Sequence, residues 1–321
     1  MINSGRINDG ATGNDNFVGG SSSISSSSWN CFAHGNANRI NGPMGSFVMG
    51  DSCEIVGGNY SRGNMAIGYY INVTGVNGSM QHGFGKYNII NNDGTYAFIY
   101  GNGTSSSSRS NAYTLDWQGN GTFAGTVSSS TGADYAEYFE WKDGNPAGED
   151  RVGYIVTLDG DKIVKANVGD DILGICSGTA MVLGDSAEWN WNKRYLTDNF
   201  GRIIYEDYDV EHEEVKDENT GKVIEEAWTE HIHAPKQNPD YNATKAYVKR
   251  ADRPEWQIVG MMGKLYVRDD GSCMVNGYAD VKDGIATKAS DKTNMRVMER
   301  VTDNIVRVLM KWDLNTNTTT Q

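Results

Sequence analysis

The sequence predicts a mainly β protein built in two parts: an N-terminal shaft of stacked β-coils and a β-rich C-terminal domain that ends in an α-helix. Three observations predict this. Glycine recurs with a fixed apolar companion through residues 1–104, short alternating apolar segments with Gly and Asp turns follow residue 150, and a 3-4-3-4 apolar pattern occupies residues 290–312. A chain of 321 residues has room for two or three domains.

The coils are predicted from a motif of Phe or Met, two further residues and then Gly, which occurs six times. Its glycines are Gly20, Gly35, Gly50, Gly68, Gly83 and Gly101, at spacings of 15, 15, 18, 15 and 18. A disordered tract would not hold a large apolar residue at a fixed offset from each glycine. We therefore expect a solenoid in which the glycine takes a corner of positive φ and the Phe or Met points inward. An apolar β-branched residue often follows five places later, as at Ile40, Ile55 and Val73.

Such coils are thin, and six of them in one chain enclose little interior. Association of three chains around a common axis would supply the missing burial, so we expect a homotrimer. His34 and His82 stand just before a repeat glycine, where other coils have an apolar residue, which favours packing over a metal or catalytic role. Carboxylates are scattered in this part, which argues against a glycan-cleaving acid pair.

The net charge of −13 is concentrated in the second part. Residues 1–127 carry five basic and six acidic side chains, whereas residues 128–321 carry 23 and 35. A chain this acidic repels phosphate backbones, so we expect no nucleic-acid partner. No stretch approaches the roughly 18 consecutive apolar residues of a membrane helix, and no apolar leader precedes the coils, so we expect no membrane partner and synthesis in a host cytoplasm.

The four cysteines, Cys31, Cys53, Cys176 and Cys273, are far apart, as expected of isolated buried thiols rather than a disulfide framework or a zinc site. His231 and His233 alternate onto one face of a predicted strand, but with no third ligand in view. "GMMGKLY" has the wrong spacing for a phosphate loop. We therefore expect neither a metal nor a cofactor.

The junction between the two parts is the most distinctive stretch chemically. "NAYTLDWQGNGTFAGTV" predicts a β-hairpin around "QGNG", and "SSSTGADYAEYFEW" then joins small hydroxyl-bearing residues to a cluster of carboxylates and aromatics. We divide the chain into a glycine-rich shaft (1–104), a hairpin and cleavage junction (105–130) and a C-terminal domain (131–321).

Residues 101–127 followed by "SSSTGADYAEYFEW" and "DGNP" resemble the junction in bacteriophage tail-spike and neck-appendage proteins. There a trimeric β-shaft is followed by a C-terminal intramolecular chaperone with autoproteolytic activity, the G2-type peptidase domain. The resemblance continues through "RVGYIVTLDGDKIVKA", "DDILGICSG" and "PEWQIVGMMGKLYVRDDGSC", and covers residues 101–312. The coils are similar to the head repeats of trimeric adhesins.

The resemblance implies a self-cutting assembly factor: the C-terminal domain trimerises the chains and then cleaves the backbone near its own start. The family uses acidic residues, which carries over to Asp134 and Glu137. The scissile bond should lie within 128–132, and Ser130–Thr131 is the first choice. The implied location is the virion, in a tail or appendage, and the implied partners are other virion proteins and a host surface glycan or receptor.

The chemistry is consistent with these residues. Two carboxylates can supply both a base and an acid if their surroundings separate their pKa values, and aromatics such as Tyr138 and Trp141 could desolvate one of them. Alternatively a hydroxyl of Ser129, Ser130 or Thr131 could attack the adjacent carbonyl. Glu140 is the alternative second acid. The simplest alternative is a plain linker beside acids that face water.

The C-terminal domain is predicted to contain several short strands and one helix. "RVGYIVTLDGDKIVKA" predicts a hairpin, "DILGICSGTAMVL" and "WQIVGMMGKLYVRDDGSCMVNG" predict further strands, and the polar segment 199–235 predicts a protruding two-stranded arm. The C-terminal helix rests on Met298, Val301, Ile305, Val308 and Trp312.

Two other functions remain open. One is a structural trimeric fibre tip that is never cut and binds a host receptor or glycan. The other is a bacterial surface adhesin, against which the lack of a signal segment and membrane anchor argues.

Overall fold

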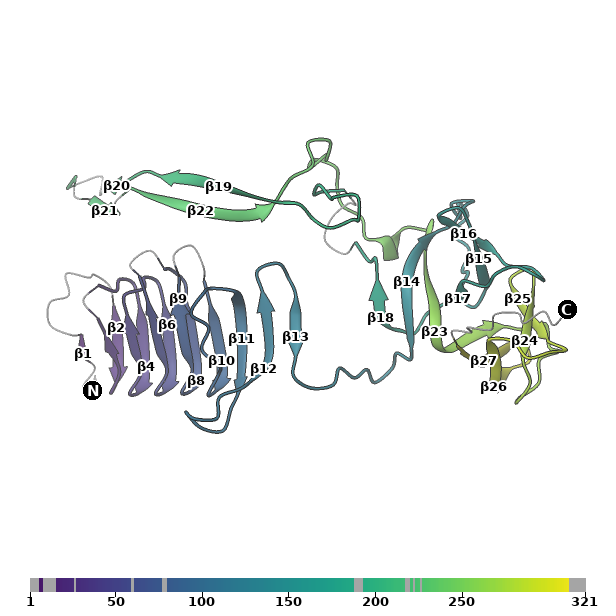
Figure 1. Cartoon of the computed structure of the whole chain (residues 1–321), viewed down its shortest axis with the longest axis horizontal. Coiled ribbons are helices and arrows are strands. Elements are labelled where there is room, and N and C mark those ends of the chain that lie inside the picture. The colour runs from purple at the N-terminus through teal and green to yellow at the C-terminus, as the bar shows by residue number, and fades with distance from the viewer. Residues whose placement is uncertain are drawn as a thin grey trace, which may run out of the picture. The chain divides into compact units, whose positions relative to one another are not determined.

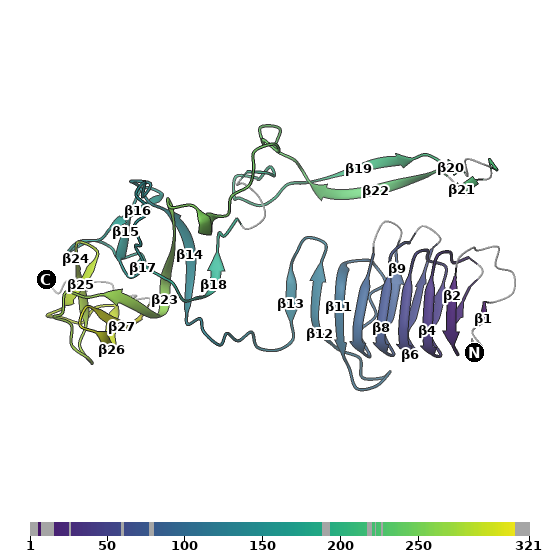
Figure 2. The same cartoon turned by 180° about the vertical axis from the view of Figure 1, so that it is seen from behind.

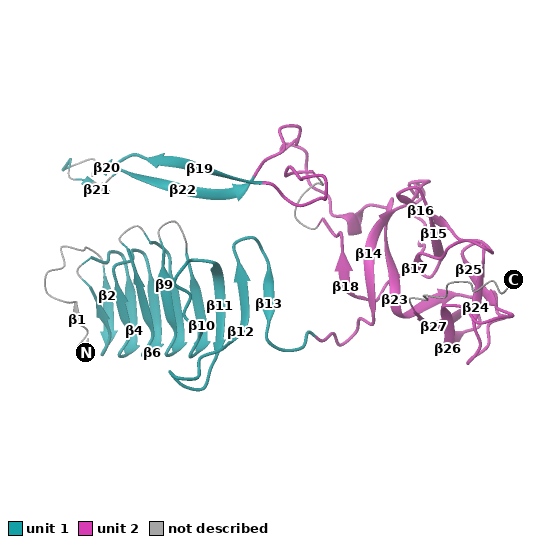
Figure 3. Cartoon of the chain, viewed as in Figure 1, with its two compact units in different colours: residues 1–127, 205–235 teal, residues 128–204, 236–321 magenta. Residues whose placement is uncertain are grey.

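The computed structural model describes residues 6–7, 16–25, 27–58, 61–76, 80–187, 193–216, 220–221, 223–225 and 227–311 (Figure 1). Within these ranges the regular elements are strands and one 3₁₀ turn, η1 (Arg250–Asp252). The chain forms two compact units, one of residues 1–127 and 205–235 and the other of residues 128–204 and 236–321 (Figure 3).

The N-terminal part is a solenoid whose strands alternate between two parallel sheets, as predicted from the repeat. The first sheet contains, in order, β1 (Arg6–Ile7), β3 (Ser23–Ile24), β5 (Arg39–Asn41), β7 (Glu54–Gly57) and β9 (Asn72–Gly75). The second sheet contains β2 (Phe17–Gly20), β4 (Phe32–Asn36), β6 (Phe47–Asp51), β8 (Met65–Tyr69), β10 (His82–Lys86) and β11 (Tyr96–Asn102). Figures 1 and 2 show the strands of this second sheet side by side from both sides.

The residues that fill the solenoid differ from those predicted. The Phe of each motif lies on the outer face of the second sheet: Phe17 is 50% exposed, and Phe17, Phe32 and Phe47 form a ladder of stacked rings with centroids 4.8 and 4.7 Å apart. The next residue along the strand is the buried one, as at Ala33 and Val48. The prediction that Phe or Met points inward is therefore wrong, because the apolar side chains that fill the narrow interior between the sheets are small or β-branched. The residues five places after the glycine, Ile40, Ile55 and Val73, do lie inside.

Corners of positive φ are confirmed at four of the six predicted glycines, and are absent at Gly83 and Gly101. Gly20, Gly35, Gly50 and Gly68 have φ of 68°, 121°, 131° and 138°. A Cβ on Gly50 would lie 2.0 Å from the carbonyl oxygen of Gly68 in the next coil. The partner of Gly68 in the following coil is Gly85, not Gly83. Gly83 instead occupies the inward column, where a Cβ would lie 2.8 Å from both Ile71 and Val73. His34 and His82 consequently belong to different columns.

Two antiparallel extensions follow the coils in this unit. The predicted hairpin is present: β12 (Asn111–Asp116) pairs with β11 and with β13 (Gly121–Phe123). The polar arm is also present, formed by β19 (Tyr205–His212) and β22 (Trp228–Pro235), with a short pair β20 (Val215–Lys216) and β21 (Val223–Glu225) beyond it. On the arm, His231 pairs with Asp209 and His233 with Asp207 across the strands.

The C-terminal unit is organised around one long strand, β23 (Trp256–Arg268). The strand order is β16-β15-β17-β23-β14-β18, and β27 and then β26 continue from the far part of β23. The other strands of this sheet are β14 (Asp134–Glu140), β15 (Ile155–Asp159), β16 (Lys162–Lys165), β17 (Gly174–Cys176), β18 (Ala180–Gly184), β26 (Met295–Thr302) and β27 (Ile305–Met310). A separate pair, β24 (Ala279–Lys282) and β25 (Ile285–Lys288), covers the larger core.

The predicted C-terminal helix is wrong. The segment forms the hairpin β26–β27, and Val297, Val306 and Val308 alternate into the larger core with period two. Met298 and Val301, on which the helical pattern depended, are 39% and 43% exposed. Valine-rich alternation favours a strand, and burial against β23 decides between the two periods. Trp312 lies outside the described residues.

All four cysteines are buried free thiols, as predicted. In the described parts of the chain, no helix has the length and apolar character needed to cross a bilayer.

Candidate cleavage site

The junction between β13 and β14 is an exposed segment without regular structure, and its backbone becomes hydrogen-bonded at Ala133. Every residue from 121 to 131 is exposed, and the exposed run ends where Ala133 enters the C-terminal sheet. The Ala133 N–H donates to the carbonyl of Thr179 at 3.1 Å, and the Ala133 carbonyl accepts from the Lys264 N–H at 3.4 Å. The segment from Ser128 to Thr131 is therefore accessible backbone directly beside ordered structure.

Asp134 opens β14 and is buried, at 3% exposure. Its Oδ1 accepts a hydrogen bond from the Thr179 hydroxyl at 3.1 Å, while its Oδ2 is buried without a hydrogen-bond partner among the described residues. Burial raises the pKa of the Asp134 carboxyl above its usual 3.8, and the hydroxyls of Ser177 and Thr179 partly oppose that rise. A carboxyl of this kind can hold a proton at a pH where an exposed one has lost it.

Two glycines of β23 make room for this carboxyl. A Cβ on Gly260 would lie 2.6 Å from Asp134 Oδ2 and 2.4 Å from Leu265 Cδ2. Gly263 has φ of 122°, and a Cβ there would lie 2.4 Å from the Ala133 carbonyl oxygen. The strand therefore bends closely around the start of β14, and the desolvation comes from backbone and Leu265.

The sequence predicted instead that neighbouring aromatic side chains would desolvate one of the acids. Phe139 and Trp141 pack in the smaller core with Val259, on the other face of the sheet from Asp134. Tyr138 lies on the same face as Asp134, four residues along the strand.

The side chains of Glu137 and Asp134 do not contact each other within one chain. Residues three apart on a strand point to opposite faces, and here Asp134, Ala136 and Tyr138 are buried on one face while Tyr135 and Glu137 lie on the other. The Tyr135 hydroxyl donates to the Glu137 carboxylate, which raises the pKa of Tyr135. The two acids thus form no pair in a single strand, and the catalytic roles of both remain a prediction.

The alternative second acid, Glu140, accepts from Lys162 Nζ at 2.6 Å. The bond to Glu140 raises the pKa of Lys162, which fits a structural ion pair.

The three hydroxyl candidates differ in their surroundings. The Ser129 Oγ accepts from the N–H groups of Thr131 and Gly132, at 3.3 and 2.8 Å, and so closes a turn at the junction. Ser130 and Thr131 are exposed beside it. A Cβ on Gly132 would lie 2.7 Å from Met181 Cα, so the chain passes closely against the start of β18.

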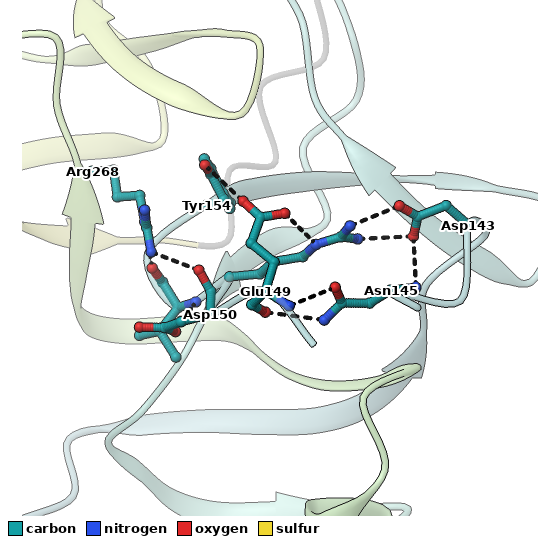
Figure 4. A network of polar contacts seen from close by, with 8 residues as sticks. Asp143, Asn145, Glu149, Asp150, Tyr154 and Arg268 are labelled. Carbon is teal, nitrogen blue, oxygen red and sulfur yellow. Dashed lines mark hydrogen bonds and ion pairs between the residues drawn. The ribbon is translucent and has the colours of Figure 1, made fainter. Parts of the chain in front are cut away.

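A second group of charges supports the loop after β14. Arg151 donates two hydrogen bonds to the carboxylate of Asp143, at 2.8 and 2.7 Å, and one to Glu149 at 3.0 Å. These bonds hold the pKa of Asp143 at about 2. Figure 4 shows the network, in which the Tyr154 hydroxyl also reaches Glu149 and Arg268 lies beside Asp150. Every charge in it is satisfied by a neighbour, which indicates a structural role.

A cleft of about 460 Å³ lies beside β14 and the start of β23. Its lining includes Tyr138, Arg151, Ser177 and Gln257. Among the described residues no group of three His, Cys, Asp or Glu side chains is arranged to hold a metal ion.

The contacts of Thr179 and Gly260 with Asp134 were not predicted from the sequence. Thr179 lies 45 residues from Asp134 and Gly260 much further, so only the sheet order brings them together. The one available signal was the run of glycines in "IVGMMGKLY", which marks a bulged strand as well as a loop.

A family model matches residues 84–306 of the chain, which includes the whole junction, β14 and β23. Its description is Peptidase_G2, IMC autoproteolytic cleavage domain. The chain belongs to this family. The resemblance inferred from the junction is thereby confirmed, and so is the predicted class of activity, an autocatalytic peptidase.

Among curated proteins, this Peptidase_G2 chain is similar to a putative phage-related protein, YobO, of Bacillus subtilis, with 44% identity over 54% of the chain and 20% of the relative. It is 37% identical to the pre-neck appendage protein of Bacillus phage B103, over 53% of the chain and 17% of the relative. The chain thus spans about a fifth of the length of these relatives.

Among solved structures, the crystal structure of pre-mature bacteriophage phi29 gene product 12 matches with a TM-score of 0.59 and 26% identity. The match covers 90% of the Peptidase_G2 chain and 35% of the phage protein. It supports the predicted order of a β-solenoid followed by a β-rich domain.

Proposed function

We propose that the chain is part of a phage tail-spike or pre-neck appendage protein, and that residues 131–321 promote homotrimer assembly and then detach by cutting the backbone at Ser130–Thr131. The observation that carries the proposal is the Asp134 carboxyl, buried and half unpartnered, a few residues from an exposed, accessible peptide segment. Membership of an autoproteolytic family and the similarity to phage appendage proteins support it.

The net reaction consumes one water. Oxygen adds to the Ser130 carbonyl carbon, the bond to the Thr131 nitrogen breaks, and that nitrogen takes up a proton as the new amine forms. The attacking oxygen comes from water directly, or from the Thr131 hydroxyl, whose ester with Ser130 water then hydrolyses. Asp134 serves as the proton carrier. Because the substrate is tethered, a modest catalyst is enough for a single turnover.

The outer face of the solenoid supports the proposed trimer. Four large apolar side chains on that face of the second sheet and its hairpin are 42–58% exposed: Phe17, Met49, Tyr100 and Phe123. A row of apolar residues on one face of a sheet is a typical interaction surface. Copies of the same chain would bury it and so extend the thin interior of each solenoid.

A denaturing gel tests cleavage. The wild-type chain should give a C-terminal product of 191 of the 321 residues, about 21 kDa of the 35.2 kDa total, with Thr131 as its first residue by N-terminal sequencing. Asp134→Asn should remain at full length yet elute as a trimer in size-exclusion chromatography. Glu137→Gln and Glu140→Gln, made in parallel, decide which further acid takes part.

The rival function is an uncut structural fibre tip that binds a host receptor or glycan through the same exposed aromatic face. A wild-type chain that trimerises and stays intact would refute self-cleavage and leave this rival standing. Cleavage that persists in Asp134→Asn would refute the role of Asp134 alone.

A further inference from the structure

Thr179, just before β18, contacts the end of the junction twice. Its carbonyl accepts from the Ala133 N–H at 3.1 Å, and its hydroxyl donates to Asp134 Oδ1 at 3.1 Å. One residue therefore fixes both the backbone at the last position before β14 and the carboxyl of the first residue in it.

Thr179 is itself held by the central strand. Its N–H donates to the Ser177 hydroxyl oxygen at 3.0 Å, and the Ser177 N–H donates to the carbonyl of Ile258 in β23 at 2.9 Å. Ser177 is buried. The position of the Thr179 hydroxyl is thus set by the sheet and not by the exposed junction.

Gly260 defines the other side of the carboxyl. The Cβ of any other residue at 260 would meet Oδ2 at 2.6 Å, which is closer than real Cβ contacts come. The carboxyl therefore has the Thr179 hydroxyl at Oδ1 and a bare glycine backbone beside Oδ2, and the Ser177 hydroxyl also acts on it by lowering its pKa. The oxygen beside Gly260 is the one without a hydrogen-bond partner among the described residues.

We propose that Thr179 is the positioning residue of the cleavage site: it holds Oδ1 of Asp134 so that Oδ2 exchanges the proton with the reacting group, and it ties Ala133 so that the scissile segment starts from a fixed point. This inference rests on the proposed function, since it assigns a role within that reaction.

The direction of a pH effect follows from the hydrogen bond. A hydroxyl that donates to a carboxylate favours the ionised form and so lowers its pKa, as Thr179 does here. Removing the hydroxyl should move the limb of the pH–rate profile that reports Asp134 to higher pH. The shift has this sign whether Asp134 acts as the acid or as the base.

The test compares Thr179→Val, which keeps the shape and loses the hydroxyl, with Thr179→Ser, which keeps the hydroxyl. The control is Thr157→Val, which removes a hydroxyl bonded to the Asp171 carbonyl elsewhere in the same unit. Full-length chains are refolded from denaturant, and the rate of conversion to the C-terminal product is followed by gel across a pH series. Circular dichroism and size-exclusion chromatography confirm that each variant folds and assembles.

We expect Thr179→Val to cleave roughly 10- to 100-fold more slowly, with its limb moved to higher pH. Thr179→Ser should recover most of the rate with the wild-type limb, and Thr157→Val should match wild type. Slower cleavage by Thr179→Val with an unmoved limb, or no rescue by serine, would overturn the inference and leave a packing role. A wild-type chain that does not cleave would instead mark the failure of the proposed function. An Asp134→Asn chain that still cleaves would overturn this inference together with the role of Asp134, and would leave self-cleavage itself standing.

A second measurement does not depend on cleavage and applies even if Thr179→Val is too unstable to cleave. In chains that also carry Ser130→Pro, urea unfolding gives the stability change of Thr179→Val with Asp134 present and with Asp134→Asn. A change that depends on the residue at 134 supports the contact as energetically coupled. Additive changes would contradict it.

Discussion

Replacing Asp134 by Asn should stabilise the C-terminal unit at neutral pH, although we expect it to abolish cleavage. Asn retains the bond from the Thr179 hydroxyl through its amide oxygen and places a neutral NH₂ beside Gly260. The wild-type carboxylate has one buried oxygen with no hydrogen-bond partner among the described residues. A buried polar group left unsatisfied costs roughly 1–3 kcal/mol, and more when it is charged. We therefore expect a gain on the order of 1–2 kcal/mol for the neutral side chain.

The size of this stability difference between wild type and Asp134→Asn depends on pH. Burial raises the pKa of Asp134 above 3.8, so the folded state binds its proton more tightly than the unfolded state does. The contribution of this group to wild-type stability is therefore full below about pH 3.8 and is lost as the pH rises through the folded pKa. The two chains should differ least in acid and most at neutral pH.

The assay is urea unfolding at equal protein concentration near pH 4 and near pH 7.5. Both chains carry Ser130→Pro in the exposed junction, which we expect to keep the reference chain uncut. With an m-value of about 1–3 kcal/mol per molar urea, the expected midpoint difference is roughly 0.3–2 M at the higher pH. If the two chains had equal urea midpoints at both pH values, or if Asp134→Asn were less stable at neutral pH, burial of the ionised Asp134 carboxylate would not destabilise the fold as argued.

Three further predictions concern the framework. Phe32→Ala removes ring contacts at 4.8 and 4.7 Å on both sides and should destabilise the solenoid by about 2–4 kcal/mol in thermal or urea unfolding. Ile55→Ala, at 0% exposure, should cost about 2–5 kcal/mol, whereas Val56→Ala, at 38%, should cost less than about 1; similar losses for both would contradict the inward assignment. Asp143 is held at a pKa of about 2 by Arg151, a contribution present above about pH 3.8 and lost as the pH falls through 2. Asp143→Asn should therefore flatten the loss of stability between about pH 4 and pH 2, measured by unfolding in a pH series.

The sequence predicted the features that depend on local pattern. Four of the glycine corners, the hairpin at "QGNG", the hairpin at Asp159-Gly160-Asp161 and the polar arm all follow from turn chemistry and alternation within about 30 residues. The junction likewise stood out because its residue types change abruptly.

The predictions that were wrong depended on which face of an element becomes buried. The Phe ladder was assigned to the interior because large apolar residues are usually inside, but the small side chains beside each Phe define the space between the sheets. The C-terminal helix failed because Met298, Val301, Ile305 and Val308 fit a helical period by chance within a strand alternation. The surroundings of Asp134 could not be predicted at all, since Thr179 and Gly260 reach it only through the order of strands in the sheet.

The column of backbone contacts along the shaft has an evolutionary consequence. Each corner glycine abuts the carbonyl of the glycine one turn on, while the number of residues per turn varies between 15 and 18. Variation in length is absorbed by the loops at the rims, so whole turns can be duplicated or deleted without disturbing their neighbours. Recombination could therefore lengthen or shorten this shaft and leave the C-terminal unit unchanged.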